Sequence, residues 1–291
     1  MKNIIVTGAG GQLGRELQAL ASAFPSLNFV FADRSVLPID DPGLIASFFD
    51  DNRCDWCINC AAYTAVDKAE TEKEAAFRIN GDAPGWLARA CKIFGARLIH
   101  ISTDYVFDGS SSTPLREDDK TAPINVYGAS KLQGEENAFR EHPDGVLIIR
   151  TSWVYSQFGN NFVKTMMRLM GERPAIGVVN DQIGSPTYAA DLAAAILHIV
   201  AGSHWAPGIY NYSNEGAISW YDFALAIREL IGSSCQVNPI PSVKFPTPAR
   251  RPHYSLLDKA LIRKTYGLSI PDWRDSLEVC VSRLLPTLTN K

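Results

Sequence analysis

A tyrosine and a lysine stand four positions apart in the segment NVYGASKLQGE at residues 125–135. On a helix, side chains at positions i and i+4 share one face, so Tyr127 and Lys131 would lie side by side. An ammonium group about 5 Å from a phenol, at an effective dielectric of about 20, would favour the phenolate by roughly 3 kcal/mol, or about two pKa units. The spacing suits a proton-transfer pair, and Lys131 could also hold a cofactor ribose. The alternative is a ring covered by a lysine stem.

Two hydroxyl side chains end the predicted strand at 96–103, in the stretch ISTDYVF. The carboxyl ends of parallel strands face the ligand crevice of an α/β sheet, so Ser102 or Thr103 would place a hydroxyl on a reacting carbonyl oxygen. A carbonyl that receives a hydride also needs an acid such as Tyr127. These residues together predict hydride chemistry with a nicotinamide cofactor.

The cofactor itself is predicted from the stretch TGAGGQLG, which contains Gly8, Gly11 and Gly14. The first glycine permits a tight turn, the second lets backbone N–H groups approach a pyrophosphate, and the third lets helix and strand pack closely. The following helix presents its positive N-terminus to the phosphates. A flexible turn is the alternative, but a position between the first predicted strand and helix favours dinucleotide binding.

The end of the second predicted strand bears on which nicotinamide cofactor binds. An acidic residue there accepts hydrogen bonds from a ribose 2′-hydroxyl, whereas an arginine accommodates a 2′-phosphate. This chain has both, because Asp33 is followed by Arg34. We therefore predict that the protein accepts NADPH or NADH, with the preference left open.

The elements that must position these residues alternate along the first half of the chain. Short β-branched runs are followed by segments with helical apolar spacing. This alternation predicts right-handed βαβ units and a doubly wound, Rossmann-type parallel sheet in an α/β fold. The predicted strands lie at 3–8, 28–33, 55–60, 96–103 and 145–155.

A smaller C-terminal lobe is predicted after about residue 155, where the alternation loosens and prolines cluster. One segment there, 218–232, keeps a helical period that ends at Gly232. We expect residues 1–155 to form the NAD(P)-binding domain, with segments around 175–200 returning to it. Residues 156–291 would then form mainly the substrate-binding lobe.

Composition limits the class of partner. A net charge of −3 and a pI near 6.0 give no basic surface for nucleic acid. No apolar run approaches 18 residues, so we expect no membrane span, and the N-terminus lacks a signal-peptide pattern, which predicts a cytoplasmic protein. Cys54, Cys57 and Cys60 have a spacing seen in metal sites, but no fourth ligand lies within thirty residues. Positions three apart on an extended strand point to opposite faces, so we predict a buried strand of small apolar cysteines and no metal site.

Several longer motifs resemble the dTDP-4-dehydrorhamnose reductases, a family of the extended short-chain dehydrogenase/reductase superfamily. The likeness runs from the first residues to about residue 285. It implies reduction of the C4 ketone of dTDP-4-dehydro-L-rhamnose to dTDP-L-rhamnose, a precursor of cell-surface polysaccharide, by NADPH or NADH. The motifs are AAYTAVDKAE (61–70), STDYVFDG (102–109), NVYGASKLQGE (125–135), RTSWVY (150–155), GNNFVKTM (159–166), NDQIGSPT (180–187) and PTPARRP (246–252).

The resemblance also implies roles for particular residues. Tyr127 would donate a proton to the developing alkoxide, Lys131 would bind the nicotinamide ribose and lower the tyrosine pKa, and Thr103 would hydrogen-bond the reacting oxygen. Asp104 and Trp153 match positions at the sugar. Gly11, Gln12 and Leu13 match the pyrophosphate turn, and Ala62, Tyr63 and Thr64 match the cofactor-facing end of the third strand.

Other residues allow two interpretations. Trp153 could be a core aromatic, but it follows a strand end beside polar residues, where a ring can pack on a sugar face. Arg250 and Arg251 could lie in a solvated loop or bind the substrate diphosphate with bidentate donors. Asn160 and Asn161 could cap the next helix or point their amides at the ligand. We include Asn161 and Arg250 among the predicted substrate residues.

The chain departs from the family pattern at two places. Pro38 stands where an acidic residue is common, which leaves the contacts to adenine open. Some members form a metal-bridged dimer through glutamates; Glu16 matches one such position, but PTYAADL has alanine at another. The resemblance therefore allows a homodimer without a predicted metal. Two other functions remain as alternatives: a non-catalytic NADP-binding regulatory subunit, or a reductase or epimerase of another nucleotide sugar.

Overall fold

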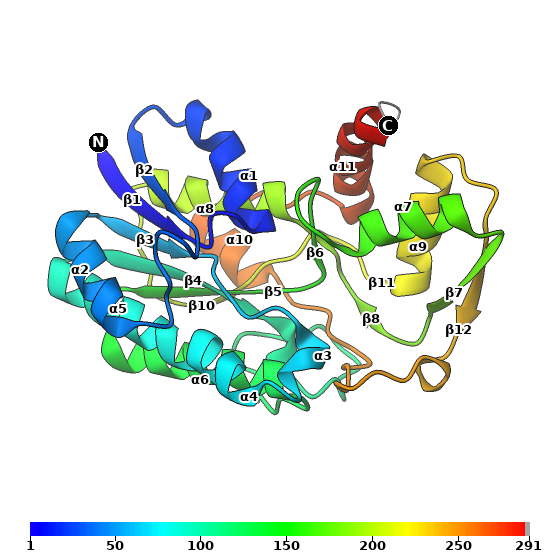
Figure 1. Cartoon of the computed structure of the whole chain (residues 1–291), viewed down its shortest axis with the longest axis horizontal. Helices are drawn as coiled ribbons and strands as arrows, with labels where there is room; N and C mark the ends of the chain where they lie inside the picture. The colour runs from blue at the N-terminus through cyan, green and yellow to red at the C-terminus, as the bar shows by residue number, and fades with distance from the viewer. Residues whose placement is uncertain (289–291) are drawn as a thin grey trace.

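A six-stranded parallel sheet lies at the centre of the protein (Figure 1). The structure, a computed structural model, describes residues 1–288. The strand order β10-β5-β4-β3-β1-β2 reverses direction at β1, as in a doubly wound fold, and the predicted Rossmann-type sheet is confirmed. The strands are β1 (Lys2–Thr7), β2 (Leu27–Ala32), β3 (Trp56–Asn59), β4 (Arg97–Thr103), β5 (Val146–Thr151) and β10 (Gly208–Asn211).

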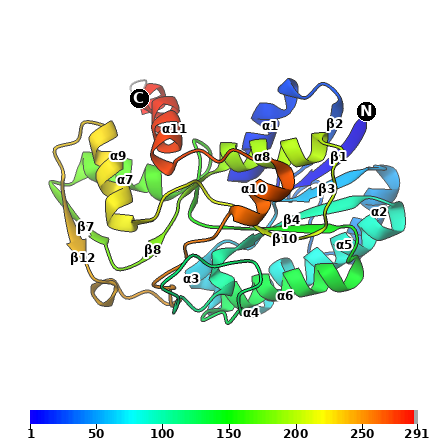
Figure 2. The ribbon, with the colours of Figure 1, turned by 180° about the vertical axis from the view of Figure 1, so that it is seen from behind.

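Helices cover both faces of this sheet (Figures 1 and 2). Successive side chains of a strand point to opposite faces, so Ile4 and Ile5 are both fully buried but join different apolar layers. Burial on both faces explains why the strands read as continuous apolar runs. One face is covered by α1 (Gln12–Leu20), α8 (Ala189–Ala201) and α10 (Ala260–Tyr266), and the other by α2 (Pro42–Asp51), α5 (Ala83–Phe94) and α6 (Val126–Glu141).

The cysteines of the β3 region belong to these apolar layers. Cys57 is fully buried in the layer beneath α5, whereas Cys60 packs against the opposite layer. Residues three apart on a strand were predicted to face opposite sides, and they do. All six cysteines have free thiols.

The last strand of the predicted series ends earlier than expected. The predicted strand 145–155 was too long, because β5 ends at Thr151 and Trp153 has a left-handed φ of 48°. Such a φ cannot continue an extended strand. The chain leaves the sheet there, and β6 (Val154–Tyr155) pairs instead with β9 (Thr187–Tyr188).

A smaller unit with its own apolar core follows (right side of Figure 1). The predicted helix at 218–232 is confirmed as α9, which begins at a capping box between Ser219 and Asp222 and ends just before Gly232, where φ is 63°. The unit is built from α7 (Phe162–Glu172), β7 (Ala175–Val179), α9 (Trp220–Leu230), β12 (Gln236–Ile240) and α11 (Trp273–Leu288).

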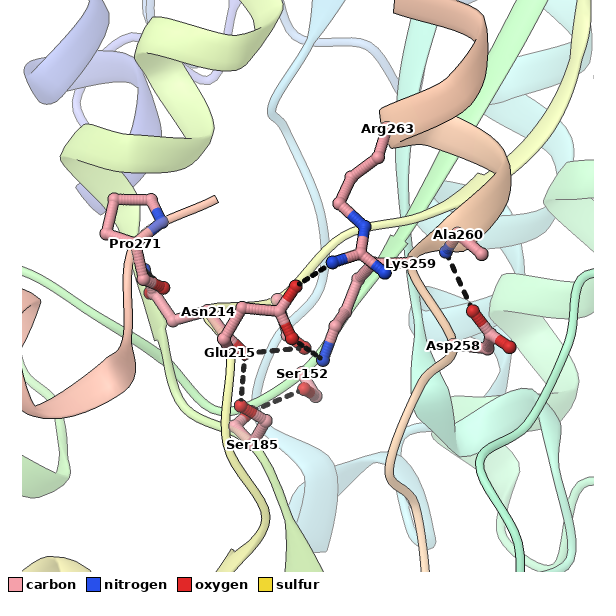
Figure 3. Close-up of polar contacts among 10 residues, drawn as sticks. Ser152, Ser185, Asn214, Glu215, Asp258, Lys259, Ala260, Arg263 and Pro271 are labelled. Atoms are coloured by element: carbon pink, nitrogen blue, oxygen red, sulfur yellow. Dashed lines mark hydrogen bonds and ion pairs between the residues drawn. The ribbon is translucent and has the colours of Figure 1, made fainter. Parts of the chain in front are cut away.

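Polar contacts hold together the segments that pass between the two units (Figure 3). The Ser152 hydroxyl donates to the carbonyl of Ser185 at 2.6 Å, and the Ser185 hydroxyl donates to the carbonyl of Asn214 at 2.5 Å. Next along the chain, the Glu215 carboxylate pairs with Lys259 at 3.2 Å and with Arg263 at 3.0 Å. These contacts join the connecting segments to one another and to α10, which covers the sheet.

Short elements complete the chain. Within residues 1–288, no helix is both long and apolar enough to cross a membrane. The short elements are η1 (Ala21–Ala23), α3 (Val66–Ala69), α4 (Lys73–Ala76), the π-helical η2 (Phe77–Asp82), η3 (Asp104–Val106), β8 (Ile183–Gly184), β11 (Ile218–Ser219) and η4 (Ser242–Lys244).

Candidate active site

A cavity of about 990 Å³ lies at the carboxyl ends of the parallel strands. Its lining includes the glycine turn after β1, the residues that follow β2, β3, β4 and β5, and Trp220 at the start of α9 in the smaller unit. Open parallel sheets bind ligands at this edge, and the volume is large enough for a nucleotide. The cavity is therefore the candidate active site.

The glycine turn is shaped by close contacts that only glycine allows. Gly8 has a φ of 64°, and a Cβ there would lie 2.5 Å from the backbone nitrogen of Ala61. A Cβ on Gly14 would lie 2.6 Å from the Cα of Ala9, so the helix could not approach the strand as closely. This turn brings the N-terminus of α1, with Gln12, to the cavity lining. A surface free of Cβ atoms at a helix N-terminus fits a pyrophosphate.

Asp33 and Arg34 both lie in the lining at the end of β2. The Asp33 carboxylate accepts hydrogen bonds from the Ser35 hydroxyl at 2.6 Å and the Ser35 amide at 2.8 Å, and these contacts lower its pKa. Arg34 is 81% exposed and lies 3.5 Å from Asp40. The carboxylate is thus held by its own turn, while the guanidinium is free to move toward a phosphate.

Tyr127 and Lys131 lie in the same lining, on the first turns of α6. The Asn125 side chain caps this helix by accepting from the Gly128 amide at 2.7 Å. Tyr127 is half-buried and packs edge-on against Tyr105, with ring centroids 5.7 Å apart. Lys131 is 2% exposed, and its Nζ donates to the carbonyl of Ile101 at 2.6 Å. Helix α6 therefore aims both groups at the end of β4.

The predicted direction of the Tyr127 pKa shift is wrong. Burial raises the pKa of Tyr127 to about 12, and the Thr103 hydroxyl opposes the shift only in part. Burial also lowers the pKa of Lys131 to about 8, against the attraction of Glu135. Desolvation penalises both charged forms and outweighs the interaction expected between the two side chains. Tyr127 is consequently neutral at pH 7, which is the form that can donate a proton.

Thr103 and Asp104 form the polar floor beside Tyr127. The Thr103 hydroxyl donates to Asp104 Oδ1 at 3.1 Å, while Asp104 Oδ2 has no hydrogen-bond partner among residues 1–288. Asp104 is only 2% exposed, and burial raises its pKa to about 6 despite the nearby Ser255 and Thr103 hydroxyls. A buried, unpaired carboxylate oxygen in a cavity lining suits a hydroxyl donor on a ligand.

Trp153 and Trp220 form the aromatic side of the cavity. Their rings stack with centroids 3.7 Å apart and an interplanar angle of 12°, and both line the cavity. Trp153 has the positive φ described above, and Gly184 lies against its ring, since a Cβ there would meet Trp153 at 3.0 Å. No sequence pattern points to Trp220, because its place depends on how α9 packs against the sheet unit.

Most predicted site residues lie together in this lining, which also contains Asn160. Those that the structure brings together are Gly8, Gly11, Gln12, Leu13, Asp33, Arg34, Ala62, Thr64, Thr103, Asp104, Tyr127, Lys131 and Trp153.

Four predicted residues lie outside the lining. Gly14 packs inside the turn, and the Tyr63 hydroxyl donates to Glu72 at 2.7 Å. Asn161 caps α7, which was one of the two alternatives predicted for it. Its side-chain amide also donates to Gln12 at 2.9 Å. Arg250 offers its carbonyl to the Asn125 amide at 2.7 Å.

The arginine pair is divided between different contacts. Arg251, the neighbour of Arg250, forms an ion pair with Asp67 at 3.0 Å. Neither guanidinium is part of the cavity surface. A contact of either guanidinium with a substrate diphosphate stays a prediction.

The sheet, the glycine turn and the facing Tyr127, Lys131 and Thr103 define a dinucleotide-binding protein of the short-chain dehydrogenase/reductase class. Comparison with known families gives a narrower assignment. The family model described as "RmlD substrate binding domain" matches residues 1–285. The chain belongs to this family.

Individual relatives match over nearly their whole length. The dTDP-4-dehydrorhamnose reductase of Aggregatibacter actinomycetemcomitans is 39% identical over 288 residues, which cover 96% of this chain and 98% of that protein. The structure of the Bacillus anthracis str. Ames dTDP-4-dehydrorhamnose reductase in complex with NADP is 40% identical, with a TM-score of 0.93 and coverage of 97% and 99%. That from Clostridium acetobutylicum ATCC 824 is 38% identical, with the same TM-score and coverage.

Proposed function

We propose that the protein reduces the C4 ketone of dTDP-4-dehydro-L-rhamnose to dTDP-L-rhamnose with NADPH or NADH. The observation that carries the proposal is the meeting of Tyr127, Lys131 and Thr103 in one cavity beside a glycine turn. The relatives named above supply the substrate class, because they are reductases of this compound by name and match the chain end to end. The NADP complex of one relative supports the cofactor class.

The residues of the cavity have complementary roles in this proposal. The bound nicotinamide supplies the hydride. Thr103 hydrogen-bonds the ketone oxygen, and neutral Tyr127 donates its phenolic proton to the oxygen as negative charge develops there. Lys131 binds the ribose, while the open Oδ2 of Asp104 accepts a sugar hydroxyl and Trp153 packs against the sugar.

We also propose the division of labour predicted from the sequence. The cofactor would bind to the N-terminal part, 1–155, and the sugar nucleotide would contact the lobe within 156–291. Helix α8, at 189–201, packs on the sheet and supports the later part of the expectation for 175–200, whereas β7, at 175–179, packs in the smaller unit. A homodimer and a cytoplasmic location remain predictions of the sequence.

The test is to mix the purified protein with dTDP-4-dehydro-L-rhamnose and follow the loss of reduced nicotinamide absorbance, with NADPH and NADH in parallel. We expect oxidation with at least one of the two cofactors, and none with dTDP-glucose, which has no ketone. Absence of oxidation with both cofactors would overturn the proposal. If NADPH nevertheless bound, that result would favour the regulatory alternative.

A further inference from the structure

A buried charged network lies directly beneath the candidate active site. The Glu135 carboxylate accepts from Arg150 Nη2 at 2.7 Å and Nε at 3.0 Å, and from the Ser102 hydroxyl at 2.5 Å. The side chains of Arg150 and Glu135 are only 3% and 2% exposed. Arg150 is also held by the carbonyl of Glu117 at 3.2 Å and by the ring of Phe107. Two side chains, Arg150 and Ser102, thus hold the carboxylate.

This network is joined to the site residues through the backbone. Ser102 immediately precedes Thr103 in β4, and it lies opposite Arg150 in the β4–β5 register. Glu135 lies one helical turn after Lys131 on α6, so the two side chains share a face. The carboxylate therefore sits between the strand end that carries Thr103 and the helix face that carries Lys131.

Stability alone does not explain why such a pair is buried. Removing two charges from water costs several kcal/mol per ion, and apolar residues of similar volume often stabilise a core as well or better. The network occurs at the one place where a buried lysine in the cavity lining needs compensation for its own desolvation. A role in the site gives a reason for keeping it.

His100, which lies near Lys131, provides no negative charge. His100 on β4 is fully buried, and burial and Lys131 lower its pKa well below the ordinary value, so it is neutral. Its Nδ1 faces the Asn59 amide at 2.9 Å, because the Asn59 carbonyl oxygen already accepts from the Thr7 hydroxyl. The proton of His100 is therefore on Nε2.

Other charged or titratable groups near this site, among the described residues, include Tyr127 on the same helix, Asp104 after β4 and Arg150 on β5. Tyr127 is neutral at pH 7, whereas Asp104 is charged above about pH 6 and contacts Thr103. Glu135 is the carboxylate whose attraction opposes the effect of burial on the pKa of Lys131.

We propose that Glu135 is a positioning residue that keeps the Lys131 ammonium charged and, through Ser102, holds the end of β4 that carries Thr103. Arg150 fixes the carboxylate, and its positive charge partly offsets the negative charge of Glu135. The proposal rests on the function proposed above where it concerns turnover, but its claim about Lys131 can be measured without any substrate. Glu135 itself touches neither substrate nor cofactor in this assignment.

The first experiment is an NMR titration of ¹³Cε-labelled lysines in the full-length protein, with the Lys131 signal assigned by its loss in Lys131→Arg. In Glu135→Gln we expect Lys131 to lose its proton about one pH unit lower than in the wild type, since an opposite charge has been removed. In Arg150→Met we expect a shift to higher pH, because the carboxylate is no longer neutralised. Glu136→Gln, an exposed neighbour on the same helix, is the control and should titrate as the wild type.

Opposite shifts in the two variants would separate an electrostatic role from simple loss of packing, which has no reason to change sign. The proposal is overturned if Lys131 titrates in Glu135→Gln as it does in Glu136→Gln. If circular dichroism shows that Glu135→Gln does not fold, the upward shift in Arg150→Met and a near wild-type titration in Glu135→Asp decide the question.

The second experiment is the pH profile of kcat/KM for NADPH-dependent reduction. Its high-pH limb should move down in Glu135→Gln and return toward the wild-type position in Glu135→Asp. If the high-pH limb of Glu135→Gln stays in place while the Lys131 titration shifts, Glu135 does not act on turnover through Lys131. A wild-type protein without turnover would overturn the proposed function, and the NMR titration would still decide the state of Lys131.

Discussion

Two walls of the cavity are built on different physical rules. The cofactor wall, which we define as the glycine turn with Asp33 and Arg34, comes from short segments whose geometry is set locally by Gly8 and by the Asp33 turn. The aromatic wall, Trp153 with Trp220, joins residues of two units and depends on how α9 packs against the sheet. Local rules can be read from a sequence, whereas the second wall exists only after the chain has folded.

The two walls should therefore respond differently to substitution. Changes in the cofactor wall should alter NADPH binding and leave the sugar nucleotide unaffected, and changes in the aromatic wall should do the reverse. Tyr127 and Asp104 lie between the walls. Substitutions there should show neither of these two patterns. Each prediction below tests one part of this comparison.

The largest effect is expected between the walls, in Tyr127→Phe. Loss of the proton donor should lower kcat by about 10²- to 10⁴-fold, while the variant still binds NADPH because the ring remains. Tyr105→Phe removes a neighbouring hydroxyl and is the matched control, with turnover expected to stay near wild type. Normal turnover in Tyr127→Phe would show that another group supplies the proton.

Gly8→Ala should break the cofactor wall. The new Cβ would lie 2.5 Å from the Ala61 nitrogen, so the turn must move, and NADPH affinity should fall at least about tenfold, or ~1.4 kcal/mol. Gly95→Ala is the control, because Gly95 also has a positive φ of 72° but a Cβ there meets nothing within 4 Å. Both variants should lose thermal stability, and fluorescence titration with NADPH should separate them. Equal affinities would contradict a close-approach role for Gly8.

Asp104→Asn tests the carboxylate between the walls. Because burial raises the pKa of Asp104 to about 6 from an ordinary 3.8, the charged form is penalised in the folded protein. This penalty, about 3 kcal/mol, is present above pH 6 and disappears as the pH falls toward 4. The variant should therefore unfold at a higher temperature than the wild type at pH 7 to 8, with the difference shrinking below pH 6.

The control for that experiment is Asp108→Asn, which changes an exposed carboxylate on the same segment. It should give no gain in stability at any pH, because its folded-state pKa is lowered by contacts with Ser110. A pH-independent difference between Asp104→Asn and wild type would mean that the substitution acts through packing.

Trp220→Ala should affect the aromatic wall alone. Loss of a ring contact worth about 0.5–1.5 kcal/mol should raise the KM for the sugar nucleotide by up to about tenfold, with the KM for NADPH unchanged. Trp205→Ala is the matched control, since Trp205 packs edge-on against Trp56 and is absent from the cavity lining. If both KM values rose together in Trp220→Ala, the separation of the two walls would fail.

The smallest effect is expected for Arg34→Ala. The guanidinium is 81% exposed, so its contact with a 2′-phosphate should contribute no more than about 1 kcal/mol, a factor of up to about five. NADPH should bind more weakly while NADH does not change, and the difference should shrink at high salt. Arg53→Ala, another exposed arginine, is the control. If the affinities for NADPH and NADH fell equally, Arg34 would not be a contact of the 2′-phosphate.

The sequence predicted what depends on neighbours along the chain. Apolar periodicity located the strands, the turn around Gly8 followed from glycine spacing, and helical spacing brought Tyr127 and Lys131 together. These features are fixed by backbone geometry over fewer than about ten residues. Because this geometry is local, the predicted neighbouring positions of Tyr127 and Lys131 agree with the structure.

Features set by burial or by the second unit were missed. The Tyr127 pKa rises because surrounding protein desolvates the phenol, which spacing alone does not reveal. Strand β5 ends at Thr151 because Trp153 turns toward the smaller unit, and Trp220 meets it from there. Arg250 lies outside the lining and its carbonyl accepts from the Asn125 amide, so its contact with the substrate stays a prediction.

The stacked indoles of Trp153 and Trp220 have an optical consequence. Two identical chromophores held nearly parallel at 3.7 Å couple their electronic transitions, so they behave as one exciton pair in the ultraviolet. Because one ring follows the sheet and the other begins α9, any change in the spacing of the two units would alter that coupling. The protein thus contains a built-in circular dichroism probe, without a label, for motion of the smaller unit against the sheet.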